Sequence, residues 1–104
     1  MKYRVLLTGR ARRQLAEIRN GGLRREIEAK IDLLATLPEL GKPLRRDLSK
    51  YRSLRAGRDR YRVIYSINKG EIRIIVVMIG ERLAGEYGDI YRKMEELVRQ
   101  EEVN

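Results

Sequence analysis

The sequence predicts a single α+β domain with the element order β-α-α-β-β-β-α. The chain has 104 residues, a length that supports one hydrophobic core but not two, so residues 1–104 are treated as one domain. Residues 10–37 carry apolar side chains at helical spacing, whereas the apolar side chains of residues 51–79 alternate or run together as in strands. A last amphipathic stretch near the C-terminus again has helical spacing.

The N-terminal part predicts a strand followed by a helical hairpin. Apolar and basic side chains alternate along Lys2–Leu7, which indicates a strand. Thr8 offers an N-cap for a helix over Arg10–Arg19, and Asn20-Gly21-Gly22 is expected to end that helix. A second helix is predicted at Leu23–Leu37, where apolar residues recur every three or four positions. The short connection makes the two helices an antiparallel pair.

The loop Pro38–Pro43 separates the helices from a predicted antiparallel meander. Its strands are expected at Tyr51–Ala56, Arg60–Ile67 and Glu71–Ile79. The last of these strands is apolar on both faces, which indicates cover from both sides of the sheet. We expect the helical hairpin to cover one face and an amphipathic helix at Asp89–Val98 to cover the other. The polar tail Gln100–Asn104 is expected to fray.

The chain is strongly basic, with 24 Lys and Arg against 15 Asp and Glu and a net charge of +9. Arginine supplies 18 of these cations, and its planar fork suits phosphate. Residues 45–62 contain eight cations and two carboxylates, so eight minus two gives +6 of the net charge. We therefore expect a polyanionic partner and favour nucleic acid over a membrane surface. The eight cations are Arg45, Arg46, Lys50, Arg52, Arg55, Arg58, Arg60 and Arg62.

Three arginines in this part of the chain are candidates for one anion site. Arg55 and Arg62 flank a predicted tight turn, in which Gly57 and Asp59 supply the turn chemistry. Arg82 lies just beyond the last strand and converges on the same cleft if the strands are neighbours. Three guanidinium groups around one phosphate would stabilise the added negative charge of a five-coordinate transition state.

The composition also argues against several classes of site. The chain contains neither Cys nor His and no tight cluster of carboxylates, so we expect no thiolate chemistry, metal site or cofactor. Its longest apolar run, Ile74–Ile79, is far shorter than a membrane span, and its first residues do not form a signal peptide. A cytoplasmic protein without membrane contact is therefore expected.

The element order and five motifs together resemble the RelE/ParE superfamily of bacterial and archaeal toxins. The resemblance extends over nearly the whole chain. The motifs are Gly41-Lys42-Pro43-Leu44, Ser53-Leu54-Arg55-Ala56-Gly57, Arg60-Tyr61-Arg62-Val63-Ile64-Tyr65, Ile79-Gly80-Glu81-Arg82 and Asp89-Ile90-Tyr91-Arg92. Each motif is weak by itself, but five of them in the right order are specific.

A RelE-like member would be the toxin of a type II toxin–antitoxin system. Such toxins are mRNA interferases, endoribonucleases that cut messenger RNA in the ribosome without metal by attack of a ribose 2′-hydroxyl on the adjacent phosphate. The resemblance implies that Arg62 and Arg82 are catalytic, with Arg55 as the basic residue of the preceding strand. It further implies a functional tyrosine, which is Tyr91 by local pattern or Tyr87 by spacing. The implied partners are a RelB-like antitoxin, the ribosome and messenger RNA.

The residues assigned to RNA binding on this basis are Arg45, Arg46, Lys50, Arg52, Ser53, Arg58 and Arg60. Members of the family carry two alternating lysines near Ser53 and Arg55, so one of these cations is missing here. Strand alternation sends Arg52 to the opposite face from Arg55. With no His, the proton acceptor is a tyrosine, Glu81 or Glu86.

Other interpretations of the same residues are open at this point. A ParE-like toxin would inhibit DNA gyrase by binding, and a third possibility is an inert nucleic-acid-binding relative. Arg62 would be structural if it paired with Asp47 or Glu71. Tyr61 and Tyr65 are expected to pack in the core or at its rim rather than stack on bases.

Overall fold

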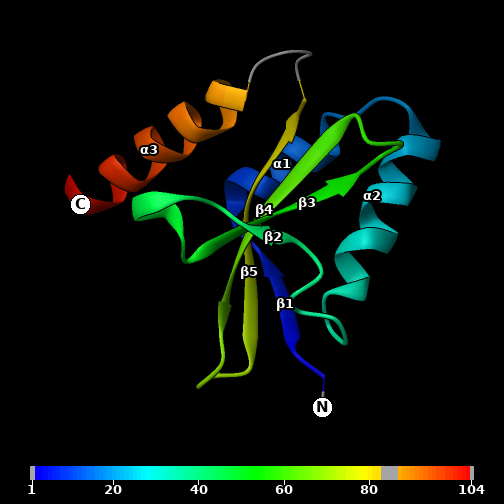
Figure 1. Cartoon of the computed structure of the whole chain (residues 1–104). Helices are drawn as coiled ribbons and strands as arrows, with labels where there is room; N and C mark the ends of the chain where they lie inside the picture. The colour runs from blue at the N-terminus through cyan, green and yellow to red at the C-terminus, as the bar shows by residue number, and fades with distance from the viewer. Residues whose placement is uncertain (1, 83–86, 104) are drawn as a thin grey trace.

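The computed structural model describes residues 2–82 and 87–103, with the backbone alone described for residues 87–91 and 101–103. A five-stranded sheet with the order β1-β5-β4-β3-β2 forms its centre (Figure 1). The strands are β1 (Arg4–Leu7), β2 (Lys42–Pro43), β3 (Tyr51–Ala56), β4 (Tyr61–Asn68) and β5 (Arg73–Glu81). β1 runs parallel to β5, and the other neighbours are antiparallel.

Helices cover the sheet on both faces. The helices α1 (Gly9–Ala16) and α2 (Gly21–Leu33) pack on one face, and α3 (Tyr87–Val103) lies on the opposite side of the sheet (Figure 1). A single turn of 3₁₀ helix, η1 (Arg46–Leu48), joins α3 in covering that second face. The predicted α+β class, the helical hairpin and the second cover by the last helix are therefore confirmed.

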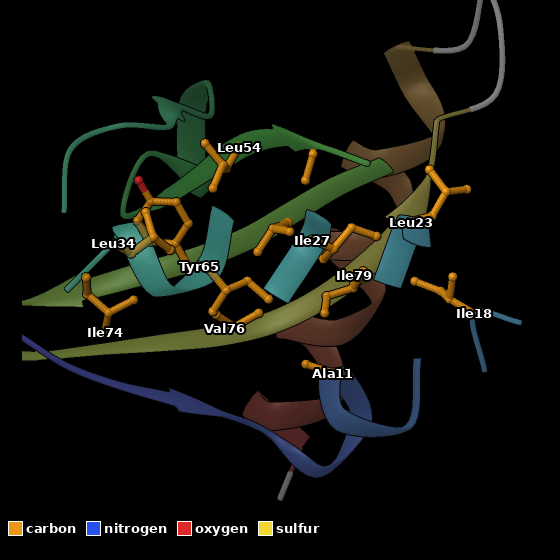
Figure 2. Close-up of a cluster of buried hydrophobic side chains, with 13 residues drawn as sticks. Ala11, Ile18, Leu23, Ile27, Leu34, Leu54, Tyr65, Ile74, Val76 and Ile79 are labelled. Carbon is orange, nitrogen blue, oxygen red and sulfur yellow. The ribbon is translucent and has the colours of Figure 1, made fainter. Parts of the chain in front are cut away.

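The larger core lies between the sheet and the two N-terminal helices. Ile27 and Leu34 of the α2 segment meet Tyr65 of β4 and Val76 of β5, and all four side chains are fully buried (Figure 2). Burying aliphatic side chains of this size contributes about 1.5–3 kcal/mol each to folding. Tyr61 packs at the edge of the same core, so the expectation that Tyr61 and Tyr65 are packing residues is confirmed.

A smaller core lies under α3. Ile64 of β4 and Val77 of β5 pack there with Met94 and Leu97 of α3. Leu48 of η1 completes this core from the side of the β2–β3 connection. Strand alternation explains the division, because Ile64 points to the opposite face from its neighbour Tyr65. The second face is thus apolar at its centre, under α3.

The ends of the N-terminal helices differ from prediction. α1 ends at Ala16, not Arg19, and α2 spans Gly21–Leu33 rather than Leu23–Leu37. Asn20 is the reason at the junction, because its Oδ1 accepts the Leu23 N–H at 3.1 Å and so caps α2 instead of ending α1. After α1 the chain turns to bury Ile18.

Two short elements were not predicted. β2 is an edge strand of two residues that pairs with β3. Proline is acceptable at Pro43 because an edge strand has a neighbouring strand on one side only, so the missing backbone N–H breaks no hydrogen bond on the other side. The 3₁₀ turn η1 follows β2.

β5 begins two residues later than predicted because the Asn68 side chain accepts the Glu71 N–H at 2.9 Å and Ile72 adopts a positive φ, which extends the turn.

α3 is longer than predicted and continues to Val103, so the tail that was expected to fray is helical up to that residue. Among the described residues, no helix has the length and apolar character that crossing a membrane requires.

Candidate active site

The strand register brings the three candidate arginines to one end of the sheet. Arg55 of β3 lies opposite Arg62 of β4, and Gly80 of β5 lies opposite Arg62 on its other side. The backbone N–H of Arg82 donates to the Arg60 carbonyl at 2.6 Å, which continues this ladder beyond β5. The predicted neighbourhood of Arg55, Arg62 and Arg82, called the arginine cluster below, is therefore confirmed.

The cluster lies on the α3 face of the sheet. Arg62 shares its face with Ile64, two positions along β4, and Arg55 shares its face with Tyr51 of β3. Gly80 has the same orientation, and among the described residues a Cβ built on it would meet no atom within 4 Å. The cluster thus borders a space above Gly80 that no described residue fills, at the end of a face whose centre is apolar.

The three guanidinium groups converge on one carboxylate, that of Asp59 in the β3–β4 turn. Arg62 Nη1 lies 3.1 Å from Asp59 Oδ1, and Arg82 Nη1 lies 3.2 Å from Oδ2. Arg55 Nε lies 3.8 Å from Oδ1. Both oxygens of a single anion are therefore bound by cations from three separate segments of the chain.

Arg62 differs from the other two arginines in its burial. Its side chain is 10% exposed, against 64% for Arg55 and 44% for Arg82. Besides the carboxylate, Arg62 Nη1 donates to the backbone carbonyls of Asp59 at 3.2 Å and Tyr61 at 3.0 Å. Among the described residues every hydrogen bond of this side chain uses Nη1, so Nη2 and Nε are left for a further acceptor.

The structure corrects the expected structural partners of Arg62, because it pairs with Asp59 and with neither Asp47 nor Glu71. Glu71 instead forms an ion pair with Arg73. The pairing with Asp59 depends on the turn, where Gly57, Arg58 and Asp59 all have a positive φ between 56° and 65°. Gly and Asp tolerate this left-handed conformation, and it folds the Asp59 carboxylate back towards the cluster.

The remaining predicted RNA-binding residues divide into two groups. Arg52 Nη1 donates to the Gly41 carbonyl at 2.7 Å, and strand alternation places Arg52 on the opposite face from Arg55, as expected. Arg58 reaches Glu26 of α2, with 3.5 Å between Nε and Oε1. Neither side chain points to the arginine cluster.

Ser53, the residue two positions before Arg55 in β3, lies on the same face of the sheet as Arg55. The other four candidates are exposed, and Lys50 lies over the ring of Tyr51 at 5.1 Å from its centroid. These four are Arg45, Arg46, Lys50 and Arg60. Arg45 and Arg46 lie at the start of η1, beside the α3 face.

The candidates for base stacking and proton transfer are only partly described. Tyr87 and Tyr91 lie on α3, but their side chains are outside the described part of the structure, as is the whole of Glu86. Glu81 is exposed and lies opposite Tyr61 in the ladder, on the face away from the cluster. The described residues contain no group of three or more carboxylates that could hold a metal ion.

A buried tyrosine anchors the loop that leads into β2. The Tyr65 hydroxyl accepts the Gly41 N–H at 2.8 Å and donates to the Pro38 carbonyl at 2.8 Å. Burial raises the pKa of Tyr65 above its ordinary value, although the bond from Gly41 and the charge of Arg52 act in the opposite direction. The hydroxyl is therefore fixed in its neutral form as a structural link.

Sequence reasoning named Asp59 only as a turn residue and missed its role as the shared partner of the cluster. A signal was present, because Asp59 is the sole carboxylate between Asp47 and Glu71, amid five arginines and two lysines. Its spacing of three from Arg62 and four from Arg55 places it within reach of both across a tight turn. Gly80 was noted only as part of a motif.

Comparisons with known proteins agree with these features. Residues 5–83 match the family model described as ParE toxin of type II toxin–antitoxin system, parDE. The structure is similar to a chain of the toxin–antitoxin complex RelBE2 from Mycobacterium tuberculosis, with 30% identity, a TM-score of 0.66 and coverage of 79% of this chain and 93% of that one. A search of curated protein sequences found no match.

Two further structures share the fold at lower identity. The RelE–RelB complex from Pyrococcus horikoshii OT3 has a chain with 24% identity, a TM-score of 0.64 and coverage of 82% of this chain and 100% of that one. A chromosomal ParDE system from P. aeruginosa gives 14% identity, a TM-score of 0.64 and coverage of 79% and 98%. By family model, identity and fold, the chain belongs to the RelE/ParE toxin superfamily and is the toxin of a type II toxin–antitoxin system.

Proposed function

We propose that this toxin is a metal-independent endoribonuclease that cuts messenger RNA in the ribosome. The observation that supports this most is the convergence of Arg55, Arg62 and Arg82 on one carboxylate. A site that holds one anion with three guanidinium groups is suited to a phosphodiester whose charge grows in the transition state.

In the proposed reaction, a ribose 2′-hydroxyl attacks the adjacent phosphate and the 5′-oxygen of the next nucleotide leaves. Arg62 is held by two backbone carbonyls, so its guanidinium group is oriented before the substrate arrives. This preorganisation is what makes fixed donors effective against developing charge. Arg55 and Arg82 are more exposed and would close on the phosphate from either side.

Proton transfer is the step for which the toxin has the fewest suitable side chains. Arginine is a poor base because it stays protonated, and the chain contains no His. Tyr87 or Tyr91 is the proposed proton donor or acceptor, or the platform on which a base stacks. The ribosome would supply the remaining contribution by holding the 2′-hydroxyl in line with the phosphate. Free RNA should therefore be a poor substrate.

The messenger RNA strand is proposed to run over the α3 face beside the cluster. Ser53 and Lys50 would line it along β3, with Arg60 at the turn and Arg45 and Arg46 beside η1. Arg52 and Arg58 make their contacts elsewhere, with Gly41 and Glu26, so we do not include them in this path.

The experiment that tests the proposal is cleavage of a defined message on purified ribosomes. Arg62→Ala and Arg82→Ala should each lower the rate about 100-fold, as expected for loss of one transition-state donor. Arg13→Ala on α1 is the control, because it removes the same charge from an exposed helix position. Equal rates for all three variants, with unchanged melting, would reject the proposed site.

The second candidate function is inhibition of DNA gyrase by binding. It is favoured by the matching family model, which describes ParE toxins. The two functions separate in a supercoiling assay with purified gyrase, run beside the ribosome assay. Inhibition of supercoiling without cleavage of ribosome-bound message would establish this second function and exclude the first.

We also propose a RelB-like antitoxin as the partner that restrains the toxin. The similar chains from M. tuberculosis and P. horikoshii come from toxin–antitoxin complexes. An acidic, amphipathic segment suits this chain, because the excess charge of residues 45–62 would attract it and the apolar residues under α3 would receive it if it displaced that helix.

A further inference from the structure

We propose that Asp59 occupies the position of the substrate phosphate in the free toxin and leaves that position when the phosphate binds. The inference depends on the proposed function for the identity of the anion. It concerns a residue of this chain that competes with the substrate. The toxin would therefore bind RNA more weakly than its arginine cluster alone would allow.

The geometry of the contacts is the first argument. Oδ1 of Asp59 faces Arg62 and Arg55, while Oδ2 faces Arg82, so the carboxylate bridges the cluster. Guanidinium groups bind carboxylate and phosphate oxygens with the same fork geometry. The position of the Asp59 carboxylate is therefore one at which an oxyanion lies within ion-pair distance of all three arginines.

The second argument concerns what happens to each partner when the carboxylate leaves. Asp59 is 47% exposed, so its side chain can rotate into water, and the ion pairs that it gives up with the exposed Arg55 and Arg82 are each worth little. Arg62 keeps its bonds to the backbone carbonyls of Asp59 and Tyr61, which do not depend on the carboxylate. Release of Asp59 thus leaves the buried cation oriented and lacking one acceptor, which a phosphate supplies.

The third argument is electrostatic. A phosphate bound by the same nitrogen atoms would lie within a few ångströms of the carboxylate if Asp59 stayed, and two anions at that distance repel each other. The alternative is that Asp59 stays beside the phosphate and orients Arg62 and Arg82. The two arrangements predict opposite effects of neutralising Asp59. If Asp59 competes with the phosphate, its neutralisation tightens phosphate binding. If Asp59 orients the arginines, its neutralisation weakens phosphate binding.

The test is to measure RNA and phosphate binding with Asp59→Asn. Asparagine has the same shape and tolerates the positive φ of 65° at this position. Asp47→Asn is the matched control, because it changes the net charge equally on the exposed surface of η1. The probes are a short single-stranded RNA made uncleavable by a 2′-deoxy substitution and, separately, inorganic phosphate.

We expect Asp59→Asn to bind both probes about tenfold more tightly than the wild type, and Asp47→Asn to bind them within about twofold of it. Weaker binding by Asp59→Asn, or the same gain in both variants, would overturn the inference. If Asp59→Asn fails to melt cooperatively, Asp59→Gly replaces it, since glycine accepts the same φ.

The outcomes separate this inference from the proposed function. Wild type that cuts ribosome-bound message, with no gain in binding for Asp59→Asn, rejects the inference alone. Tighter phosphate binding by Asp59→Asn, with no cleavage by the wild type, rejects the nuclease and leaves Asp59 as the occupant of an anion site.

Discussion

Gly80 lies directly opposite Arg62 in the β4–β5 ladder, and none of the described residues fills the space above its Cα. A methyl group at Gly80 would meet no described atom within 4 Å, so Gly80→Ala should fold normally and keep most of its cleavage activity. Gly80→Leu should also fold, but its side chain would fill the space beside the cluster. We expect its cleavage rate on ribosomes to fall at least about tenfold, as for a misplaced substrate.

The comparison of Gly80→Ala with Gly80→Leu is the internal control, because both variants alter the backbone in the same way. Thermal melting should be similar for the two. Full activity of Gly80→Leu would mean that the phosphate does not approach the sheet above Gly80.

Gly41 predicts a stability effect away from the site. A Cβ at this position would lie 2.9 Å from the Ser53 carbonyl oxygen and 2.9 Å from the Tyr65 ring. Gly41→Ala should therefore destabilise the fold by about 1–3 kcal/mol, because neither neighbour can move freely. Gly70→Ala is the control, with its nearest atom at 3.5 Å, and should change stability by less than about 0.5 kcal/mol. Urea denaturation of both variants measures the difference.

Tyr65 predicts a dependence of stability on alkaline pH. Because burial raises its pKa, the folded state binds a proton that the unfolded state begins to lose near pH ~10. The stabilisation is complete below that pH and is lost as the pH rises through the folded-state pKa. Tyr65→Phe lacks this titration and also leaves Gly41 N–H and the Pro38 carbonyl unpaired, at a cost of about 1–3 kcal/mol.

The stability difference between wild type and Tyr65→Phe should therefore stay constant below about pH 10, the tyrosine reference value, and shrink as the pH rises above it. Urea titrations at several pH values measure it, and the comparison cancels the titration of all other groups. A difference that stayed constant above that pH would show that Tyr65 ionises equally easily in both states.

Cleavage should not require a divalent metal ion. The proposed site stabilises charge with guanidinium groups, and the described residues contain no carboxylate cluster for a cation. Adding EDTA to the toxin, and removing it before intact ribosomes are supplied, should leave the rate unchanged. Loss of activity that added Mg²⁺ restores, with the ribosomes intact throughout, would contradict the mechanism.

Binding of the antitoxin should depend on how firmly α3 is seated. Met94 of α3 is fully buried, so Met94→Ala should loosen the helix without touching the cluster. If the antitoxin displaces α3, its affinity for Met94→Ala rises, whereas an antitoxin that packs over α3 binds the variant equally or less well. Glu95→Ala, an exposed neighbour, is the control in calorimetric titrations.

The same titrations at increasing salt test the charged part of this interface. Affinity should fall with salt but not vanish, because apolar burial is not screened. If a tenfold increase in salt concentration left the affinity unchanged, the antitoxin would not bind through the excess charge of residues 45–62.

Period-two patterning and turn residues are local signals, and they were enough to predict β3 with its observed bounds and to place Arg55 across the turn from Arg62. Other features depend on contacts that a local pattern does not contain. Asparagine is common both at the end and at the start of a helix. Asn20 is at the start of α2 because its side chain accepts the Leu23 N–H. The bridging role of Asp59 needed the left-handed turn of residues 57–59, and β2 is too short to leave a periodic signal.

The parallel pairing of β1 with β5 has a consequence for the order of folding. Thr8 at the end of β1 donates its hydroxyl hydrogen to the Val77 carbonyl, 69 residues later in the chain. Closing so long a loop costs entropy before any contact offsets it, which slows folding relative to a chain of local contacts. During synthesis β1 therefore cannot pair until β5 has been made. A nascent toxin reaches its active shape only when β5 and the Arg82 that follows it have been made.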